Sequence, residues 1–239
     1  GIHIVGMSAT IGNLNEVASF LKADVYTQNF RPVELHEYVK CDDTIWRVNS
    51  TSIDILTDEK KVTYRYSEQA LKHDPDKIGG FVMEVVPNDS CLIFCPSKQN
   101  CENVAIMLTR VLFRTLLKHK VQDKERLLEA LKNEGSLCPI LKVTICYGIA
   151  YHHSGLTTEE RRLIEDAFRD GILCVICCTS TLAAGVNLPA RRVILRSPYV
   201  GMNLINLSKY KQMTGRAGRA GMGEIGESIL ICKPADIIK

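Results

Sequence analysis

The sequence has little net charge, few aromatic residues and no long apolar segment. Its net charge of +3 permits nucleic-acid binding but does not demand it. Aromatic residues make up 6% of the chain and do not cluster, so the stacking platform of a dedicated single-strand-binding module is missing. No run of about 18 apolar residues predicts a membrane span, and the first residues do not read as a secretory signal.

The sequence also lacks the residue spacings of a metal site. Its ten cysteines are scattered along the chain. Cys174 and Cys177 face opposite sides of an expected strand, and Cys178 shares a side with Cys174 but lies about 13 Å away along an extended chain. We interpret all three as small core residues of a reduced, nuclear or cytosolic protein. The adjacent His152 and His153 do not have the spacing of zinc ligands either.

Apolar segments with strand character alternate with amphipathic helical patterns. We expect strands at residues 1–7, 33–40, 62–66, 91–95, 172–178, 192–195 and 228–232. We expect helices at residues 13–22, 80–86, 98–119, 123–133 and 157–171, the last opened by a capping box of Thr157 and Glu160. This alternation predicts an α/β fold in which a parallel sheet is covered by helices on both faces.

Short polar clusters follow several of the expected strands. Ser8 and Thr10 follow the first strand, and Ser97, Thr179 and Ser197 follow later ones. Ligands of open parallel sheets bind beyond the carboxyl ends of the strands, and hydroxyls at helix starts suit phosphate oxygens. One such cluster is more often a helix cap, but several together indicate phosphate chemistry or contact with a phosphodiester backbone.

Two arginines and a glutamine near the C-terminus have the spacing of one helical face. Gln212, Arg216 and Arg219 are separated by four and three residues, so a helix opening here would align their side chains. Gly215 and Gly218 would weaken that helix by about 1 kcal/mol each, which suggests close approach to an anion. Paired guanidinium groups could stabilise a transferring phosphoryl group. A solvated basic helix start and a nucleic-acid phosphate site are the alternatives.

The chain has no phosphate-binding loop for the triphosphate on which such arginines would act. The 239 residues contain no GxxxxGK[ST] loop, and no acidic pair follows a strand where it could hold magnesium. The arginines and polar strand ends therefore look like half of an active site.

The order of these segments resembles the motif series of superfamily 2 helicases. The matching segments are residues 7–10 for motif III, 91–98 for motif IV, 179–190 for motif V and 212–219 for motif VI. Residues 151–156, which read YHHSGL, are similar to an element of the superkiller and archaeal repair branch, and residues 30–35 resemble its interdomain connection. Within that branch the chain is most similar to members related to the helicase domain of DNA polymerase theta. Residues 44–89 match least.

The resemblance implies a division of the chain. Residues 1–31 would be the tail of a first RecA-like domain, and residues 32–90 an interdomain connection with an insertion. Residues 91–239 would form a second RecA-like domain carrying motifs IV to VI. Walker A and DExH motifs would lie upstream, and winged-helix and ratchet domains downstream. We therefore expect a fragment that does not hydrolyse ATP alone and that self-associates through exposed apolar surface.

The resemblance also implies roles at the nucleotide. Arg216 and Arg219 would reach the γ-phosphate when the RecA-like domains close, and would stabilise the transition state. Gln212 would lie beside the nucleotide or its attacking water. Gly185 and Asn187 would form the nucleotide-facing edge of motif V. ATP and Mg²⁺ would be cofactors of the full-length protein, and neither is expected on the fragment.

A second group of implied roles concerns nucleic acid. Ser8 and Thr10 would couple the nucleotide state to domain closure. Thr179 and Ser97 would contact the backbone of a single strand, with His153 nearby, and such contacts carry no sequence information.

The function implied by the resemblance is an ATP-dependent helicase that unwinds DNA with 3′-to-5′ polarity during repair in the nucleus. Its partners would be single-stranded or forked DNA and the other domains of the same protein, with no membrane association. Two alternatives stay open: an RNA helicase of RNA surveillance or splicing, and a passive single-strand-binding module. The nucleic acid that stimulates ATP turnover would discriminate between DNA and RNA.

Overall fold

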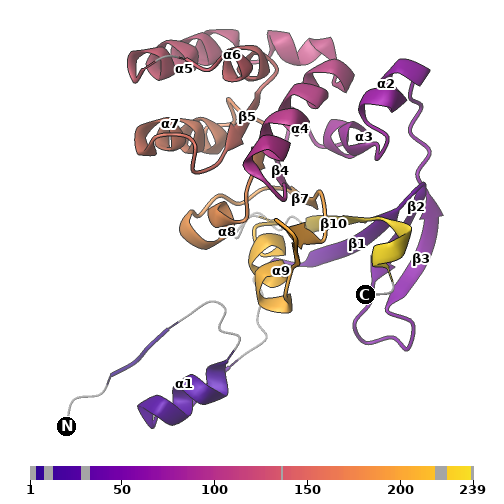
Figure 1. Cartoon of the computed structure of the whole chain (residues 1–239), viewed down its shortest axis with the longest axis vertical. Helices are drawn as coiled ribbons and strands as arrows, with labels where there is room; N and C mark the ends of the chain where they lie inside the picture. The colour runs from indigo at the N-terminus through magenta and orange to yellow at the C-terminus, as the bar shows by residue number, and fades with distance from the viewer. Residues whose placement is uncertain (1–3, 8–12, 28–32, 136, 219–224, 238–239) are drawn as a thin grey trace.

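The computed structural model describes residues 4–7, 13–27, 33–135, 137–218 and 225–237. Within them, an eight-stranded sheet has the order β3-β2-β1-β10-β7-β4-β6-β5 (Figure 1). Its strands are β1 (Leu35–Cys41), β2 (Thr44–Val48), β3 (Leu56–Lys61), β4 (Cys91–Phe94), β5 (Ile149–His152), β6 (Val175–Cys178), β7 (Arg192–Leu195) and β10 (Gly226–Cys232). Pairing is parallel from β1 across to β5, whereas β2 and β3 are antiparallel additions at one edge. The predicted α/β fold with a parallel sheet is confirmed.

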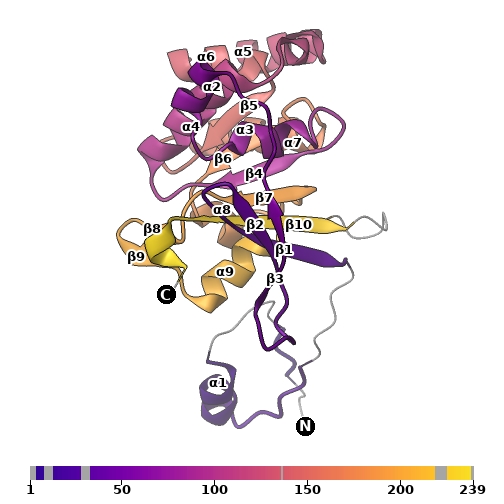
Figure 2. The ribbon, with the colours of Figure 1, turned by 90° about the vertical axis from the view of Figure 1, so that its right-hand side faces the viewer.

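Helices flank this sheet. The described helices are α1 (Leu14–Leu21), α2 (Glu68–His73), α3 (Ile78–Met83), α4 (Lys98–Val111), α5 (Val121–Asn133), α6 (Pro139–Cys146), α7 (Thr158–Arg169), α8 (Thr181–Gly185) and α9 (Leu207–Thr214), with 3-10 turns at Arg114–Lys118 and Pro234–Asp236. Helix α4 packs against β5 and β6, α6 and α7 pack against β5, and α9 packs against β7 (Figure 2). A small hairpin joins β8 (Tyr199–Val200) to β9 (Asn203–Leu204). None of the described helices is long and apolar enough to span a membrane.

The central strands form the core because their sequences are apolar except for His152 at the end of β5 and Arg192 at the start of β7. Every residue of β4, β5, β6 and β7 is buried, as expected for parallel strands covered on both faces. Cys174, Cys177 and Cys178 are buried here, which confirms their interpretation as core residues. Burial raises the pKa of all three thiols, so they stay protonated and unreactive.

The strand expected at residues 62–66 is wrong, and the edge strand β3 precedes it. The tyrosines of that segment support α3 instead of a sheet. The Tyr66 hydroxyl donates to Asp74 Oδ2 at 2.7 Å and accepts from the Gly80 backbone N–H at 2.8 Å. The Tyr64 ring packs edge-on against Phe81, with ring centroids 5.1 Å apart. The aromatic pattern therefore reflects packing on a helix rather than strand pairing.

Other predicted boundaries also shift. The helix expected at 98–119 ends at Val111, and a 3-10 turn follows whose Leu116 carbonyl accepts from the buried Lys124 ammonium at 2.6 Å. Helices α2 and α6 and strand β5 were not predicted. Residues 4–7, the described part of the first expected strand, form no strand. The predicted helix at 157–171 is confirmed as α7, with its capping box present.

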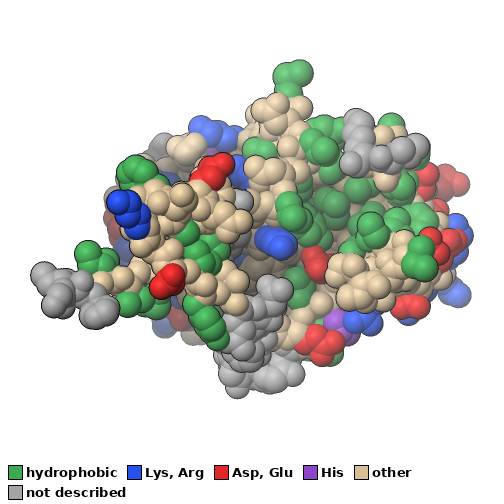
Figure 3. Space-filling model, turned by 90° about the horizontal axis from the view of Figure 1, so that it is seen from below, with side chains coloured by type: hydrophobic (Ala, Val, Ile, Leu, Met, Phe, Trp, Pro, Cys, Tyr) green, Lys and Arg blue, Asp and Glu red, His purple; other side chains and the backbone are tan. Residues whose placement is uncertain are grey.

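The N-terminal segment carries apolar side chains that the described residues do not cover. No residue of α1 is buried, and Ile4, Met7 and Phe20 are each more than four-fifths exposed. Figure 1 shows α1 apart from the sheet, and Figure 3, which views the molecule from below, shows hydrophobic side chains exposed on that side.

Candidate functional site

Three of the predicted polar residues lie at one edge of the sheet. Ser97, Thr179 and Ser197 follow β4, β6 and β7, which are neighbouring parallel strands, so all three come from the carboxyl edge. Backbone hydrogen bonds connect the strand ends there. The Cys95 N–H donates to the Cys178 carbonyl, and the Arg196 N–H donates to the Phe94 carbonyl, both at 2.8 Å. The expected gathering of polar clusters at this edge is confirmed for the described residues.

Ser97 opens α4 as its N-cap. Its hydroxyl accepts the Asn100 N–H at 3.2 Å, and the side chain lies in an exposed position. The first turn of a helix carries N–H groups without intrahelical partners and a partial positive charge. An anionic oxygen at this point would therefore be stabilised.

Thr179 ends the neighbouring strand and precedes α8. Its hydroxyl lies 2.9 Å from that of Thr181, and its backbone N–H donates to the His152 carbonyl at 3.4 Å. The side chain is half-buried. Its hydroxyl could donate to a phosphate oxygen and accept from Thr181 at the same time.

His153, expected near the nucleic acid, is 5% exposed. Its Nε2 lies 3.0 Å from Glu102 Oε1, and its Nδ1 accepts the Gly155 N–H at 3.0 Å. The ring stacks on Tyr151, with centroids 4.9 Å apart. Both ring nitrogens are thus occupied within the protein.

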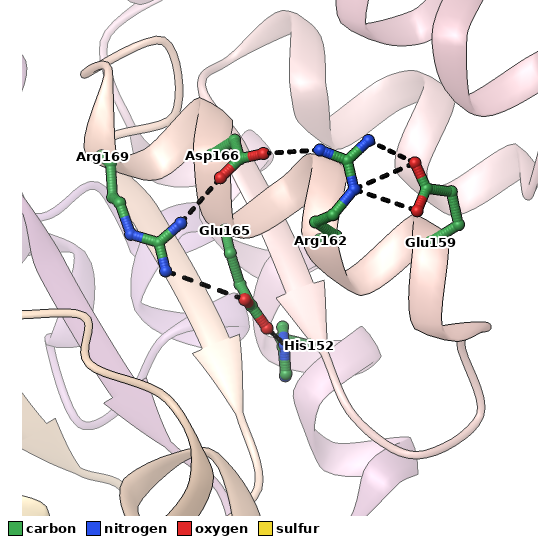
Figure 4. Close-up of polar contacts among 6 residues, drawn as sticks. All are labelled: His152, Glu159, Arg162, Glu165, Asp166 and Arg169. Carbon is green, nitrogen blue, oxygen red and sulfur yellow. Dashed lines mark hydrogen bonds and ion pairs between the residues drawn. The ribbon is translucent and has the colours of Figure 1, made fainter.

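His152 faces a different helix. Its Nε2 lies 2.8 Å from Glu165 Oε1 on α7, and Arg169 lies 3.9 Å from the other oxygen of that carboxylate (Figure 4). The residue is 4% exposed, and no described residue hydrogen-bonds to its Nδ1. Burial lowers the pKa of His152, although Glu165 opposes the effect.

The shared helical face expected of Gln212 and Arg216 is wrong. Helix α9 ends at Thr214, so Gln212 lies in its last turn and Arg216 lies beyond it. Gly218 has a left-handed φ of +89°, and a Cβ there would lie 2.4 Å from Val33 Cγ1. The glycines therefore end the helix and let this segment pack beside β1. Arg219, like Ser8 and Thr10, lies outside the described residues.

The Arg216 guanidinium lies against the preceding motif segment. Its Nη2 donates to the Ala183 carbonyl in α8, while its Nε is buried and has no hydrogen-bond partner among the described residues. The Arg216 carbonyl accepts the Ala190 N–H at 2.9 Å. Burial lowers the pKa of Arg216 from its ordinary high value, and the group stays a cation.

Two further predicted residues lie at the end of α8, the helix that Arg216 contacts, or just after it. Gly185 ends α8, two residues after Ala183, and a Cβ at Gly185 would meet nothing within 4 Å. Asn187 is exposed. A fixed cation beside an exposed, sterically open turn is an arrangement that suits a phosphate group.

Several supporting residues were missed. Glu102 and Glu165 hold the two histidines, and the Tyr210 hydroxyl donates to Glu37 Oε1 at 2.8 Å, which ties α9 to β1. The partners of these residues lie far away in the sequence, so no local pattern predicts the contacts.

Comparison with known proteins shows similarity to DNA helicases. The family model described as the helicase conserved C-terminal domain matches residues 113–221. The chain is 57% identical over 240 residues to the Helicase POLQ-like of Drosophila melanogaster, covering 98% of the chain and 23% of that protein. It is 55% identical to the Helicase POLQ-like of Homo sapiens, with 98% and 21% covered. It is 36% identical to the ATP-dependent DNA helicase Hel308 of Methanococcus vannielii, with 97% and 30% covered. The chain spans less than a third of the length of these relatives.

Proposed function

Because this chain belongs to the superfamily 2 helicases, in the branch of the POLQ-like and Hel308 helicases, we propose that it contributes the second RecA-like domain to an ATP-dependent DNA helicase. The identity to these relatives across 98% of the chain supports the proposal. Strands β1 to β3 share one sheet with β4 to β7, so we place the start of this unit near Leu35. Residues 1–31 would belong to the first RecA-like domain, joined through the connection that begins at residue 32.

The observation that carries the nucleotide role is the placement of Arg216. Its guanidinium is held beside α8, and its buried Nε has no partner in the part of the chain that the structure describes. In the proposed mechanism, Arg216 and Arg219 stabilise charge on the transferring phosphoryl group, and Gln212 lies beside the nucleotide or its attacking water. Gly185 and Asn187 form the exposed edge that faces the nucleotide. Ser8 and Thr10 couple nucleotide state to closure of the two domains.

The described residues fit the phosphate end of ATP rather than its metal. Arg216 supplies a cation with an unused donor, but no group of three or more metal-ligating side chains occurs among the described residues. We propose that Mg²⁺ reaches the site with ATP and is held by residues other than those described. The metal would neutralise phosphate charge, and the arginines would add the stabilisation specific to the transition state.

Ser97 and Thr179 are the proposed contacts to the nucleic acid. Both lie at the carboxyl edge of the sheet, one at a helix N-terminus and one at a strand end. Hydroxyl and amide contacts to phosphates are independent of base sequence, so we propose translocation along any sequence, with 3′-to-5′ polarity. The name of the Hel308 relative includes DNA as its substrate, and this favours DNA over RNA. We further propose a role in DNA repair, in the nucleus.

The test of the arginine role uses the full-length protein with Arg216→Ala and Arg216→Lys. We expect turnover of ATP to fall by roughly a thousandfold in Arg216→Ala, the lower end of the effect of an arginine finger. Lysine keeps the charge but loses the planar fork, so Arg216→Lys should recover only part of the loss. Affinity for single-stranded DNA should change little. Wild-type turnover in Arg216→Ala would contradict the assignment, and we expect no turnover from the 239-residue chain by itself.

A further inference from the structure

Two adjacent histidines at the end of β5 reach helices on opposite faces of the sheet. Neighbouring residues of a strand point to opposite faces. His152 Nε2 lies 2.8 Å from Glu165 Oε1 on α7, as Figure 4 shows, and His153 Nε2 lies 3.0 Å from Glu102 Oε1 on α4. Neither histidine is more than 5% exposed. The end of β5 is therefore tied to one helix on each side.

The hydrogen bonds of His153 define its tautomer. Its Nδ1 accepts the Gly155 N–H at 3.0 Å, so the ring proton lies on Nε2 and is donated to Glu102. A Cβ on Gly155 would lie 2.7 Å from His153 Cε1, so a glycine is needed where the chain turns back over the ring. The imidazole has no nitrogen left for a phosphate.

Each histidine is also connected to one of the segments that carry the proposed phosphate contacts, His153 through Glu102 and His152 through its own backbone carbonyl. Glu102 lies near the start of α4, the helix that Ser97 caps. The His152 carbonyl accepts the Thr179 N–H at 3.4 Å. Movement of either histidine would therefore shift the start of α4 or the end of β6 against the other.

We propose that Glu102, His152, His153 and Glu165 form a brace that positions Ser97 and Thr179 for a phosphodiester backbone, and that His153 does not itself contact nucleic acid. This inference rests on the proposed function. The carboxylate of Glu102 distinguishes this brace from direct contact between His153 and a phosphate. Beside a phosphate-binding imidazole it would repel the nucleic acid, whereas in a brace it is required for binding.

The test measures ATP turnover of the full-length protein against the concentration of a single-stranded thymidine oligonucleotide. The variants are Glu102→Ala, His153→Ala and the double substitution. The brace predicts that Glu102→Ala raises the half-maximal DNA concentration by about tenfold, as expected for loss of one hydrogen bond to a charged group. His153→Ala should match it, and the double variant should add little because both remove the same contact. Turnover at saturating DNA should change much less than the half-maximal concentration.

Direct contact predicts the opposite sign for the carboxylate. If His153 touched phosphate, Glu102→Ala would remove a negative charge beside the DNA and lower the half-maximal concentration, and this result would overturn the brace. Glu102→Gln keeps an acceptor oxygen without the charge, so the brace predicts a value within about twofold of wild type. Glu102→Gln distinguishes the brace from direct contact even if Glu102→Ala fails to fold, because direct contact predicts that Glu102→Gln binds DNA more tightly than wild type.

A matched control is available on α7. Glu159 is an exposed carboxylate paired with Arg162 and is no part of the brace (Figure 4). Glu159→Ala should leave the half-maximal DNA concentration unchanged, and an effect equal to that of Glu102→Ala would point to net charge and overturn the brace. A wild-type protein without DNA-stimulated turnover would instead remove the proposed function itself.

Discussion

Substitution of Gly218 tests whether the segment after α9 must pack as described. Gly218 has a φ of +89°, and a Cβ there would lie 2.4 Å from Val33 Cγ1 and 3.2 Å from the Gly226 Cα. Its N–H donates to the Ala190 carbonyl at 2.6 Å, so the backbone is held at this point. Gly218→Ala therefore forces a side chain into a left-handed conformation and against two neighbouring segments.

The loss of stability expected in Gly218→Ala is the sum of a conformational cost and a packing cost. A left-handed conformation costs a non-glycine residue about 1–2 kcal/mol, and an added methyl in a packed site costs about 1–3 kcal/mol. We expect the free energy of unfolding of Gly218→Ala to fall by about 2–5 kcal/mol, measured by urea denaturation of this chain. ATP turnover of the full-length protein should fall as well, because Gly218 lies between Arg216 and Arg219.

Gly185→Ala is the control. A Cβ at Gly185 meets nothing within 4 Å, and the residue lies at the end of α8. Alanine should leave stability unchanged or raise it by up to about 1 kcal/mol. A loss of ATP affinity in this variant would then report on the nucleotide and not on folding. Gly218→Ala unfolding at the wild-type urea midpoint would refute the packing argument.

Three further predictions follow from polar contacts. Arg192 is 9% exposed and contacts Glu84 at 2.5 Å and Glu227 at 2.8 Å. Arg192→Met should lower the free energy of unfolding by about 3 kcal/mol in denaturant titrations, the low end for a broken buried ion pair, because it removes the cation that both carboxylates share and leaves Glu84 with the Tyr64 hydroxyl and Glu227 with the more distant Arg191. Burial lowers the pKa of His152 from 6.5, so the stability due to its neutral form is present above that pH and is lost as the pH falls below it. The free energy of unfolding should therefore change less steeply with pH in His152→Gln than in the wild type. An unchanged pH dependence would contradict the burial of a neutral His152. Tyr210→Phe removes the 2.8 Å hydrogen bond to Glu37. It should lower the free energy of unfolding by about 1 kcal/mol and reduce ATP turnover without changing DNA affinity. Wild-type turnover would show that α9 does not need its hydrogen bond to β1.

Much of the fold was predictable because its strands have distinctive compositions. The apolar residues of β4, β6 and β7 identified buried parallel strands, and the capping box at Thr157 located the start of α7. The same reasoning missed β5, because its last residue, His152, and the next residue, His153, are polar. Its histidines are buried only because Glu102 and Glu165 from distant helices satisfy them, and no local pattern reports such partners.

The sequence predicted which strand ends carry the polar residues of the candidate site, but not the backbone conformation around Arg216. Ser97 and Thr179 each follow a predicted strand, and the carboxyl ends of parallel strands lie at the same edge of a sheet, so their shared location was predictable. The spacing of Gln212 and Arg216 was read as one helical face, but Gly215 caps α9 and places Arg216 beyond the helix. The burial of His153 was also unforeseen. A glycine can end a helix as well as interrupt one, and the close packing of Gly218 against Val33 is a long-range contact that no local pattern reports.

The most direct test of the account is ATP turnover by the full-length protein with single-stranded DNA, and then with RNA of equal length and sequence. We predict strong stimulation by DNA and little by RNA. Stimulation mainly by RNA would contradict the proposed substrate and move the protein to the RNA-processing helicases, and no stimulation by either would contradict the proposed helicase function.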